Sequence, residues 1–129
     1  MGVEHTQGRA VIDRWDRVFS ALAAEPRRQL IVALNDIPPE NNVLLPEAAM
    51  SPTVPPQRDQ ITLELKHHHL PMLAEHGYVE WTETPFRASR GPNFDDVGIV
   101  FDALHDRAQL MPDRLVTGCK RLEEERRSN

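Results

Sequence analysis

The chain has 129 residues, 40% of them hydrophobic, which is enough for one domain with its own apolar core and too little for two. Its 20 acidic and 15 basic residues give a net charge of −5, which weighs against binding driven mainly by phosphate contacts without excluding nucleic acid as a partner. Cys119 is the single cysteine, which excludes an internal disulfide and a Cys-x-x-Cys metal site. Since no apolar run reaches the length of a membrane span and no hydrophobic signal core begins the chain, we expect a cytoplasmic protein without a membrane partner.

The first part of the chain predicts two helices. Over residues 9–24 apolar side chains recur at intervals of three and four, which is typical of a helix with one broad apolar face. Pro26 ends this helix and suits the first turn of a second helix over residues 26–35. Arg27 and Arg28 fall in that first turn, where the helix dipole disfavours positive charge. Either a phosphate bound at the helix start or solvated arginines with salt-bridge partners would account for them.

The next segment changes in composition. Residues 36–57 contain six of the 11 prolines, which indicates an irregular connection rather than a long helix or strand. Within it we predict a short strand at residues 43–45 and a one-turn helix at residues 46–50. Residues 51–57 are expected to form a stiff, extended entry into the following helix.

Residues 58–90 predict a long helix, a glycine stop and a two-stranded hairpin. The predicted apolar stripe of the helix comprises Ile61, Leu63, Leu65, Leu70 and Leu73. Pro71 lies inside the helix and predicts a kink rather than a break, while Gly77 occupies the left-handed position that commonly ends a helix. Strand formers follow at residues 78–82 and 86–90. A helix, a glycine and a hairpin in this order are typical of the second half of a winged helix-turn-helix, a module that usually reads DNA.

The closing helix has regular apolar spacing. Asn93 is predicted as its N-cap, and apolar residues from Phe94 to Leu115 alternate by three and four, which indicates a narrow seam for another helix. Pro112 is expected to bend or end this helix near Met111. Together with the first helix the seam predicts a homodimer interface made of Val11, Trp15, Val18, Leu22, Val97, Phe101, Leu104 and Ala108.

The expected fold class is therefore mainly α with a small β-hairpin wing: a winged helix-turn-helix with flanking helices for dimerisation. We expect a disordered lead over residues 1–8, the domain itself over residues 9–111, and a charged, frayed tail over residues 112–129.

Candidate DNA contacts lie on the polar side of the long helix and on the hairpin. They are Gln57, Arg58, Gln60, Glu64, His67, His68, Arg87 and Arg90. Gln60 suits pairing with adenine and Arg58 suits guanine or a phosphate, while Glu64 repels phosphates but can accept a hydrogen bond from cytosine N4. The alternative interpretation is a helix with an ordinary solvated polar face.

Other chemistry has weaker signals. The consecutive residues His67–His69 point about 100° apart on a helix and cannot all bind one ion, so His69 is predicted as a core histidine bonded to the backbone. Asp102, His105 and Asp106 have the spacing of helical metal ligands, but this pattern is common by chance. There is no glycine-rich phosphate loop and no nucleophile elbow, so we expect no enzyme activity, no cofactor and no resident metal.

Three segments carry a resemblance to a known group. FSALAAEPRRQLIVAL (Phe19–Leu34) resembles the second-helix signature of ArsR-like winged-helix regulators, and ELKHHHLPMLAEHGYVEW (Glu64–Trp81) is similar to a haloarchaeal branch of that group. RGPNFDD (Arg90–Asp96) fits the entry of that branch into its closing helix. The resemblance covers most of residues 9–111.

What the resemblance implies is a small, often dimeric, sequence-specific transcriptional regulator of haloarchaea or of a virus that infects them. The chain departs from metal-sensing relatives because it lacks their paired cysteines, and its proline-rich segment before the long helix is unusually long. Two alternatives remain: a winged-helix protein-interaction module without DNA binding, and a ligand or metal sensor with its site at the dimer seam.

Overall fold

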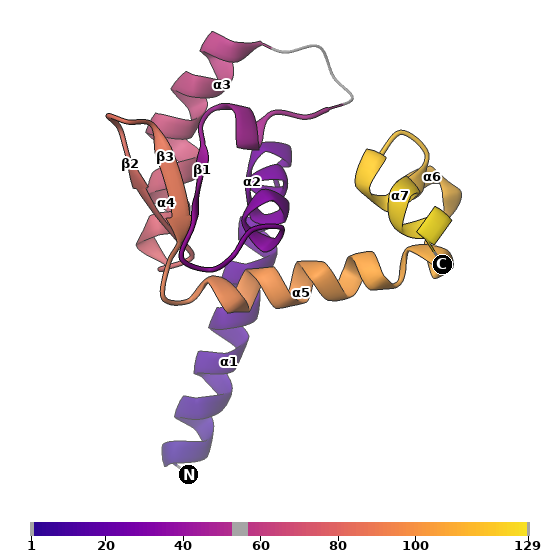
Figure 1. Ribbon diagram of the computed structural model, residues 1–129. Coiled ribbons are helices and arrows are strands. Elements are labelled where there is room, and N and C mark those ends of the chain that lie inside the picture. The colour runs from indigo at the N-terminus through magenta and orange to yellow at the C-terminus, as the bar shows by residue number, and fades with distance from the viewer. Residues whose placement is uncertain (1, 53–56, 129) are drawn as a thin grey trace.

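The computed structural model describes residues 2–52 and 57–128, with side chains from residue 7 onward. The described chain is mainly helical and has one small antiparallel sheet (Figure 1). None of the described helices combines the length and the apolar character needed to cross a bilayer. The elements are α1 (Gly2–Ala21), α2 (Glu25–Asn35), β1 (Asn42–Leu44), a 3-10 turn η1 (Glu47–Ala49), α3 (Arg58–Glu64), a π-helical turn η2 (Leu65–His69), α4 (Leu70–Glu75), β2 (Val79–Thr82), β3 (Arg87–Arg90), α5 (Phe94–Asp106), a 3-10 turn η3 (Ala108–Leu110), α6 (Asp113–Val116) and α7 (Lys120–Ser128).

Helix α1 is longer than predicted. It begins at Gly2, so residues 2–8 are helical and the prediction of a disordered lead is wrong. No proline interrupts this segment, and extending a helix that has already nucleated costs little. In Figure 1 the N-terminal half of α1 projects away from the other elements.

The sheet has three strands in the order β1-β3-β2, both pairings being antiparallel. Val43 and Trp81 both pair with Ala88, which is buried against the helices. The predicted short strand and one-turn helix are confirmed as β1 and η1, each within a residue of the expected start. Part of the predicted extended entry, residues 53–56, lies outside the described residues.

The segments α3, η2 and α4 form one continuous helix, as predicted. Pro71 has no N–H to donate and its ring crowds the preceding turn, and the helix widens into the π-helical turn η2 just before it. At the end, Gly77 has a φ of 75°, Tyr78 donates to the carbonyl of Leu73, and the backbone N–H of Gly77 donates to Ala74. These two bonds make a Schellman motif, so the glycine stop is confirmed.

One residue of the predicted apolar stripe is misplaced. Leu63 is 60% exposed, whereas Leu65, Leu70 and Leu73 are fully buried. At about 100° per residue Leu63 lies roughly 200° around the helix from Ile61 and cannot share its face.

The core lies between α2, the continuous helix, the sheet and the start of α5. Its fully buried side chains include Leu30, Ile31, Leu34, Leu65, Leu70, Leu73, Tyr78, Val79, Phe94 and Val97. Full burial of each aliphatic side chain contributes about 1.5–3 kcal/mol. Helix α2 contacts η1, β1, η2 and α5, so the other elements are arranged around it.

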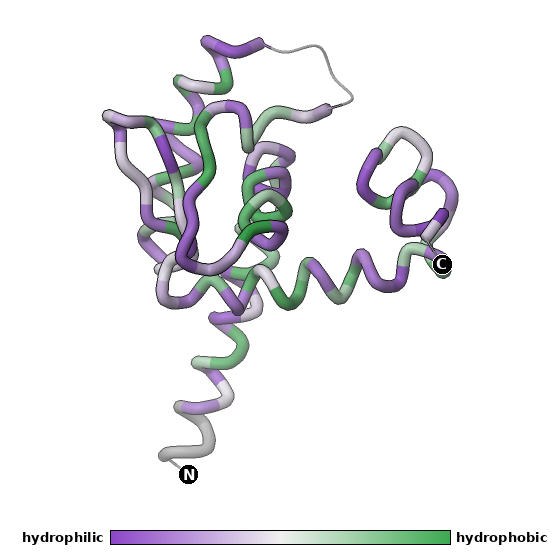
Figure 2. The backbone as a smooth tube through the Cα atoms, in the orientation of Figure 1, coloured by the Kyte–Doolittle hydropathy of each residue, from purple (hydrophilic) through white to green (hydrophobic). Residues whose placement is uncertain are grey.

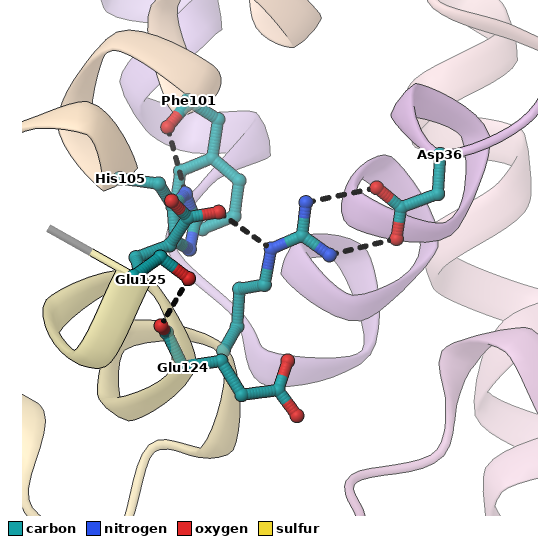
Figure 3. A network of polar contacts seen from close by, with 7 residues as sticks. Asp36, Phe101, His105, Glu124 and Glu125 are labelled. Atoms are coloured by element: carbon teal, nitrogen blue, oxygen red, sulfur yellow. Dashed lines mark hydrogen bonds and ion pairs between the residues drawn. The ribbon is translucent and has the colours of Figure 1, made fainter.

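The C-terminal segment folds back instead of fraying, which corrects the prediction of a frayed tail for the described residues 112–128. Helix α5 ends at Asp106, earlier than Pro112 requires, and α7 packs against α5 and η3. Arg126 donates to the carbonyls of Ala108 and Met111. The guanidinium of Arg121 binds Asp36 through two contacts of 2.8 Å, which Figure 3 shows as a pair of dashed lines. Arginine side chains thus satisfy carbonyl and carboxylate groups that apolar periodicity does not report.

Candidate nucleic-acid interface

The predicted polar face of α3 is open to solvent. Gln57, Arg58, Gln60, His67 and His68 are exposed, and Glu64 is half-buried. The start of α3 lies at the opposite end of the molecule from the start of α1, and the turn of the β2–β3 hairpin lies nearer the other end of α3, where Glu83 contacts Lys66 of η2 (Figure 1). No described element covers this end, so the face remains available to a partner.

The cations near this face have acidic partners within the chain. Arg58 forms an ion pair with Glu47 of η1. The pKa of Glu47 is held below its usual value first by a hydrogen bond from its own backbone N–H and then by the hydrogen bond from Arg58. Lys66 forms a 3.4 Å ion pair with Glu83 of the hairpin turn, and its ammonium lies 5.1 Å from the ring centroid of Phe86. These exposed ion pairs are weak and can be exchanged for a stronger anionic partner.

Arg87 and Arg90 of β3 lie in different environments. Arg87 donates a 2.9 Å hydrogen bond to the amide oxygen of Asn42 on the neighbouring strand. Arg90 donates twice to the single carbonyl of Leu34, at 3.2 and 2.9 Å, and once to that of Ile37 at 3.0 Å, and its guanidinium carbon lies 5.0 Å from the ring centroid of Phe94. The geometry does not support the prediction that Arg90 contacts DNA, because its donors satisfy carbonyl groups at and just after the end of α2.

A signal for the role of Arg90 was present in the strand pattern. Side chains alternate along a strand, so Arg90 lies on the same side as the buried Ala88, while Arg87 lies on the opposite side. An arginine on the inner side of a sheet needs an acceptor there, and the end of a helix supplies one.

Arg27 is buried, and its donors are bonded to carbonyl groups of the chain instead of being free for a phosphate. Its guanidinium donates to the carbonyls of Ala21 at 3.0 Å and Ser20 at 2.9 Å, both at the end of α1. Arg28 donates to Leu22 of the same end. The predicted conflict with the dipole of α2 disappears, because both cations lie at the negative C-terminal end of α1. The phosphate hypothesis is not supported, since these donors already have acceptors.

His69 is buried as predicted, but its partner is a side chain and not the backbone. The Nδ1 atom of His69 lies 2.7 Å from a terminal guanidinium nitrogen of Arg27. Burial lowers the pKa of His69 first, and the neighbouring positive charge of Arg27 lowers it further. This contact joins the π-helical turn η2 to the junction of α1 and α2.

An apolar groove of about 310 Å³ lies between α1 and α5. Figure 2 shows hydrophobic and hydrophilic residues alternating along both helices. The lining includes Val11, Trp15, Ile99 and Val100, together with Arg14, Asp95 and Asp96. The rings of Trp15 and Phe19 stack at 5.8 Å, and both are about half exposed, at 48% and 60%. This is an apolar surface that the subunit itself leaves uncovered.

The predicted dimer seam is only partly available at the surface. Val11, Trp15 and Leu104 are exposed and Phe101 is partly exposed. The remaining predicted seam residues, Val18, Leu22, Val97 and Ala108, are buried within the single chain, so their assignment to an interface is wrong. The apolar spacing of these four residues identifies a side of the helices that other residues of the same chain cover. Sequence reasoning also missed Ile12, Phe19 and Ile99, which are exposed on the same two helices.

Within the described residues, no three His, Cys, Asp or Glu side chains gather closely enough to hold a metal ion. The candidate ligand His105 donates from Nδ1 to the carbonyl of Phe101 at 2.8 Å, and the two rings lie 4.5 Å apart (Figure 3).

Comparison of the chain with protein-family models, curated proteins and solved structures gives no match in any of the three. The geometry of the chain's own residues is therefore what bears on its function.

Proposed function

We propose that the chain is a winged helix-turn-helix protein that binds double-stranded DNA as a homodimer and regulates transcription. The observation that carries this proposal is the exposed polar face of α3, which begins at a free end of the molecule and continues into η2 beside the hairpin turn (Figure 1). In this proposal α2 and the α3–α4 helix are the helix-turn-helix pair, and β2 and β3 are the wing. The resemblance of Glu64–Trp81 to haloarchaeal ArsR-like regulators supports the same assignment.

The residues on this face suit direct reading of base edges. Gln60 can accept and donate one hydrogen bond each to adenine, and the adjacent exposed Leu63 can contact the methyl group of thymine. Arg58 can leave Glu47 for a phosphate, and Arg87 can reach the backbone from the outer side of the sheet. With so few cations on the face, phosphate contacts would supply little affinity, and base contacts would supply the specificity.

The experiment that tests DNA binding is selection of duplexes from a random library by the purified protein. We expect a two-fold symmetric motif whose half-sites are centred about one helical turn, roughly 34 Å, apart. Gln60→Ala is expected to relax one base position of each half-site, with a loss of about 1–3 kcal/mol of discrimination. Binding constants for the selected duplex and for single-base variants measure this loss.

Two further variants, Arg87→Ala and Arg114→Ala, each lose one positive charge, and the second is the control for the first. Arg87→Ala is expected to weaken binding to all sequences about equally, while Arg114→Ala, on α6, is expected to leave affinity unchanged. Recovery of no motif from the library, at low and at multimolar salt, would contradict the proposal.

The homodimer is tested by a charge in the groove. Ile99 is 64% exposed and lines the groove between α1 and α5, so Ile99→Asp leaves the core intact and places a desolvated carboxylate in the proposed interface. We expect the variant to be a monomer by light scattering. The control is Leu110→Asp on η3, where the side chain is 75% exposed and outside the groove. Equal masses for the wild type and Ile99→Asp would rule out this interface.

A second candidate is a protein-interaction module that keeps the fold and does not bind DNA. The observation that favours it is the pairing of Arg58 with Glu47 and of Lys66 with Glu83, with Arg90 committed to α2, on a chain of net charge −5. An intact dimer that selects no DNA sequence would favour this candidate over the first.

A further inference from the structure

The contact between Arg27 and His69 joins three helices at one buried point. Arg27 belongs to the first turn of α2, donates to the last carbonyls of α1, and reaches the final residue of the π-helical turn η2. Both side chains are 6% exposed. Within residues 2–52 and 57–128 we find no other side-chain hydrogen bond that connects the α3–α4 helix to the junction of α1 and α2.

The chemistry of this contact allows one protonation state only. An arginine guanidinium has donors and no acceptor, so the Nδ1 atom of His69, at 2.7 Å, must be the acceptor and must carry no proton. The imidazole of His69 is therefore neutral, and its one ring proton is on Nε2. Protonation of Nδ1 would remove the acceptor and place a second positive charge beside the first.

The neighbouring charges offset that repulsion only in part: the carboxylate of Glu64 raises the pKa of His69, but burial, Arg27 and His68 together lower it by more. On α2, Arg28 and Glu25 form their own 3.1 Å ion pair. On its own helix, the ring of His68 lies 4.9 Å from that of His69, and the carboxylate of Glu64 receives a hydrogen bond from Gln60.

From the hairpin, Glu83 is paired with Lys66. The remaining partners of Arg27 are the carbonyls of Ser20 and Ala21, which hold the cation in place.

We propose that the Arg27–His69 contact is a proton-operated latch, which holds the α3–α4 helix against the junction of α1 and α2 and opens when His69 takes up a proton. Opening frees the helix from α1 while the apolar core persists. If the chain binds DNA as proposed above, the latch makes the position of α3, and with it DNA binding, dependent on pH. Only this consequence rests on the proposed function. The latch itself is tested without DNA, so its failure is distinguishable from failure of DNA binding.

The direction of the pH effect follows from linkage. Burial and the charge of Arg27 lower the pKa of His69 below its ordinary value of 6.5, so the open state binds more protons than the closed state. The latch is at full strength above pH 6.5 and weakens as the pH falls through the pKa of the closed state. Between the pKa values of the open and the closed state the opening equilibrium grows by up to about tenfold for each pH unit, the limit for uptake of one proton.

The first measurement is an imidazole nitrogen NMR titration of the wild-type protein. We expect Nδ1 of His69 to be unprotonated and Nε2 to carry the proton at neutral pH, with a midpoint below 6.5. A proton on Nδ1 at neutral pH, or a midpoint at or above the ordinary value, would overturn the latch. This measurement needs no variant and stands even if a substitution prevents folding.

The second measurement is amide hydrogen exchange of the wild type and of His69→Asn, whose side-chain oxygen replaces Nδ1 as an acceptor that does not titrate. The ratio of their rates cancels the pH dependence of exchange itself. We expect this ratio to rise as the pH falls below about 6.5, by up to about tenfold per pH unit, for amides of α3 and η2 and not for those of α2 and α5. His68→Asn, an exposed neighbour, should behave as the wild type. A ratio that does not change with pH, or that rises equally for the amides of all helices, would mean that the contact only stabilises the fold. Either result would contradict the proposal.

Discussion

Arg27→Ala is expected to lower the free energy of unfolding by about 3–5 kcal/mol, since leaving a buried polar partner unsatisfied costs about 1–3 kcal/mol per group. The substitution removes the donor from three acceptors: the carbonyls of Ala21 and Ser20 and the Nδ1 atom of His69. It also leaves a space where the side chain was buried. Urea unfolding at neutral pH, monitored by circular dichroism, measures the loss.

The control for this prediction is the adjacent arginine. Arg28 also donates to a carbonyl of α1, that of Leu22, and pairs with Glu25, but its side chain is 37% exposed. Water can replace its contacts, so Arg28→Ala is expected to cost about 1 kcal/mol or less. Equal losses for the two variants would mean that burial of Arg27 does not matter as argued.

Gly91→Ala is expected to cost about 3 kcal/mol, the upper part of the usual range for overpacking. A Cβ atom on Gly91 would lie 2.4 Å from the carbonyl oxygen of Gly77 and 2.8 Å from its carbonyl carbon. Both are backbone atoms of the helix stop, and the backbone N–H of Gly91 is also bonded to the carbonyl of Tyr78. The obstacle cannot rotate away, so the hairpin and the helix end must separate. Thermal unfolding of the variant measures the effect.

The comparison that tests this reason is Gly77→Ala. Gly77 has the positive φ of 75°, which costs other residues about 1–2 kcal/mol, but its Cβ would meet the side chain of Asn93 at 2.8 Å, which can move. We therefore expect the glycine with the ordinary backbone conformation to be the less replaceable one. The reverse order of stabilities would refute the steric argument.

The parts of the fold that depend on local signals could be predicted from the sequence. The stop at Gly77, the hairpin strands, the 3-10 turn η1 and the continuation of the helix through Pro71 are all confirmed. Each follows from the conformational preferences of a few adjacent residues, which do not change when distant segments pack. The start of α5 after Asn93 is confirmed in the same way, although the Asn93 side chain donates to His76 instead of capping α5.

The partners of the arginines could not be predicted, because each depends on two elements far apart in the chain. Arg27 and Arg90 each cap a helix end whose position only the folded chain defines. Arg121 reaches Asp36 across most of the sequence. A composition rich in arginine indicates many donors but not which of them face solvent, so the candidate DNA contacts included one structural residue.

The seam was predicted only in part for a related reason. Apolar spacing along α1 and α5 identifies sides that avoid water, but it does not say whether the subunit or a second copy covers them. Val18 and Val97 face the subunit's own core, whereas Trp15 and Ile99 do not. Exposure in the folded chain is the information that separates these pairs.

Helix α7 contains no buried residue and is attached through guanidinium groups. Dissolved ions screen attractions of this kind while leaving the packing of aliphatic groups intact or strengthening it. The apolar core and α7 therefore respond differently to salt. At high salt concentration the packing of the core is kept or strengthened, whereas the attachment of α7 to the rest of the chain is weakened. Ionic strength, and not heat, is then the variable that would separate the last helix from the rest.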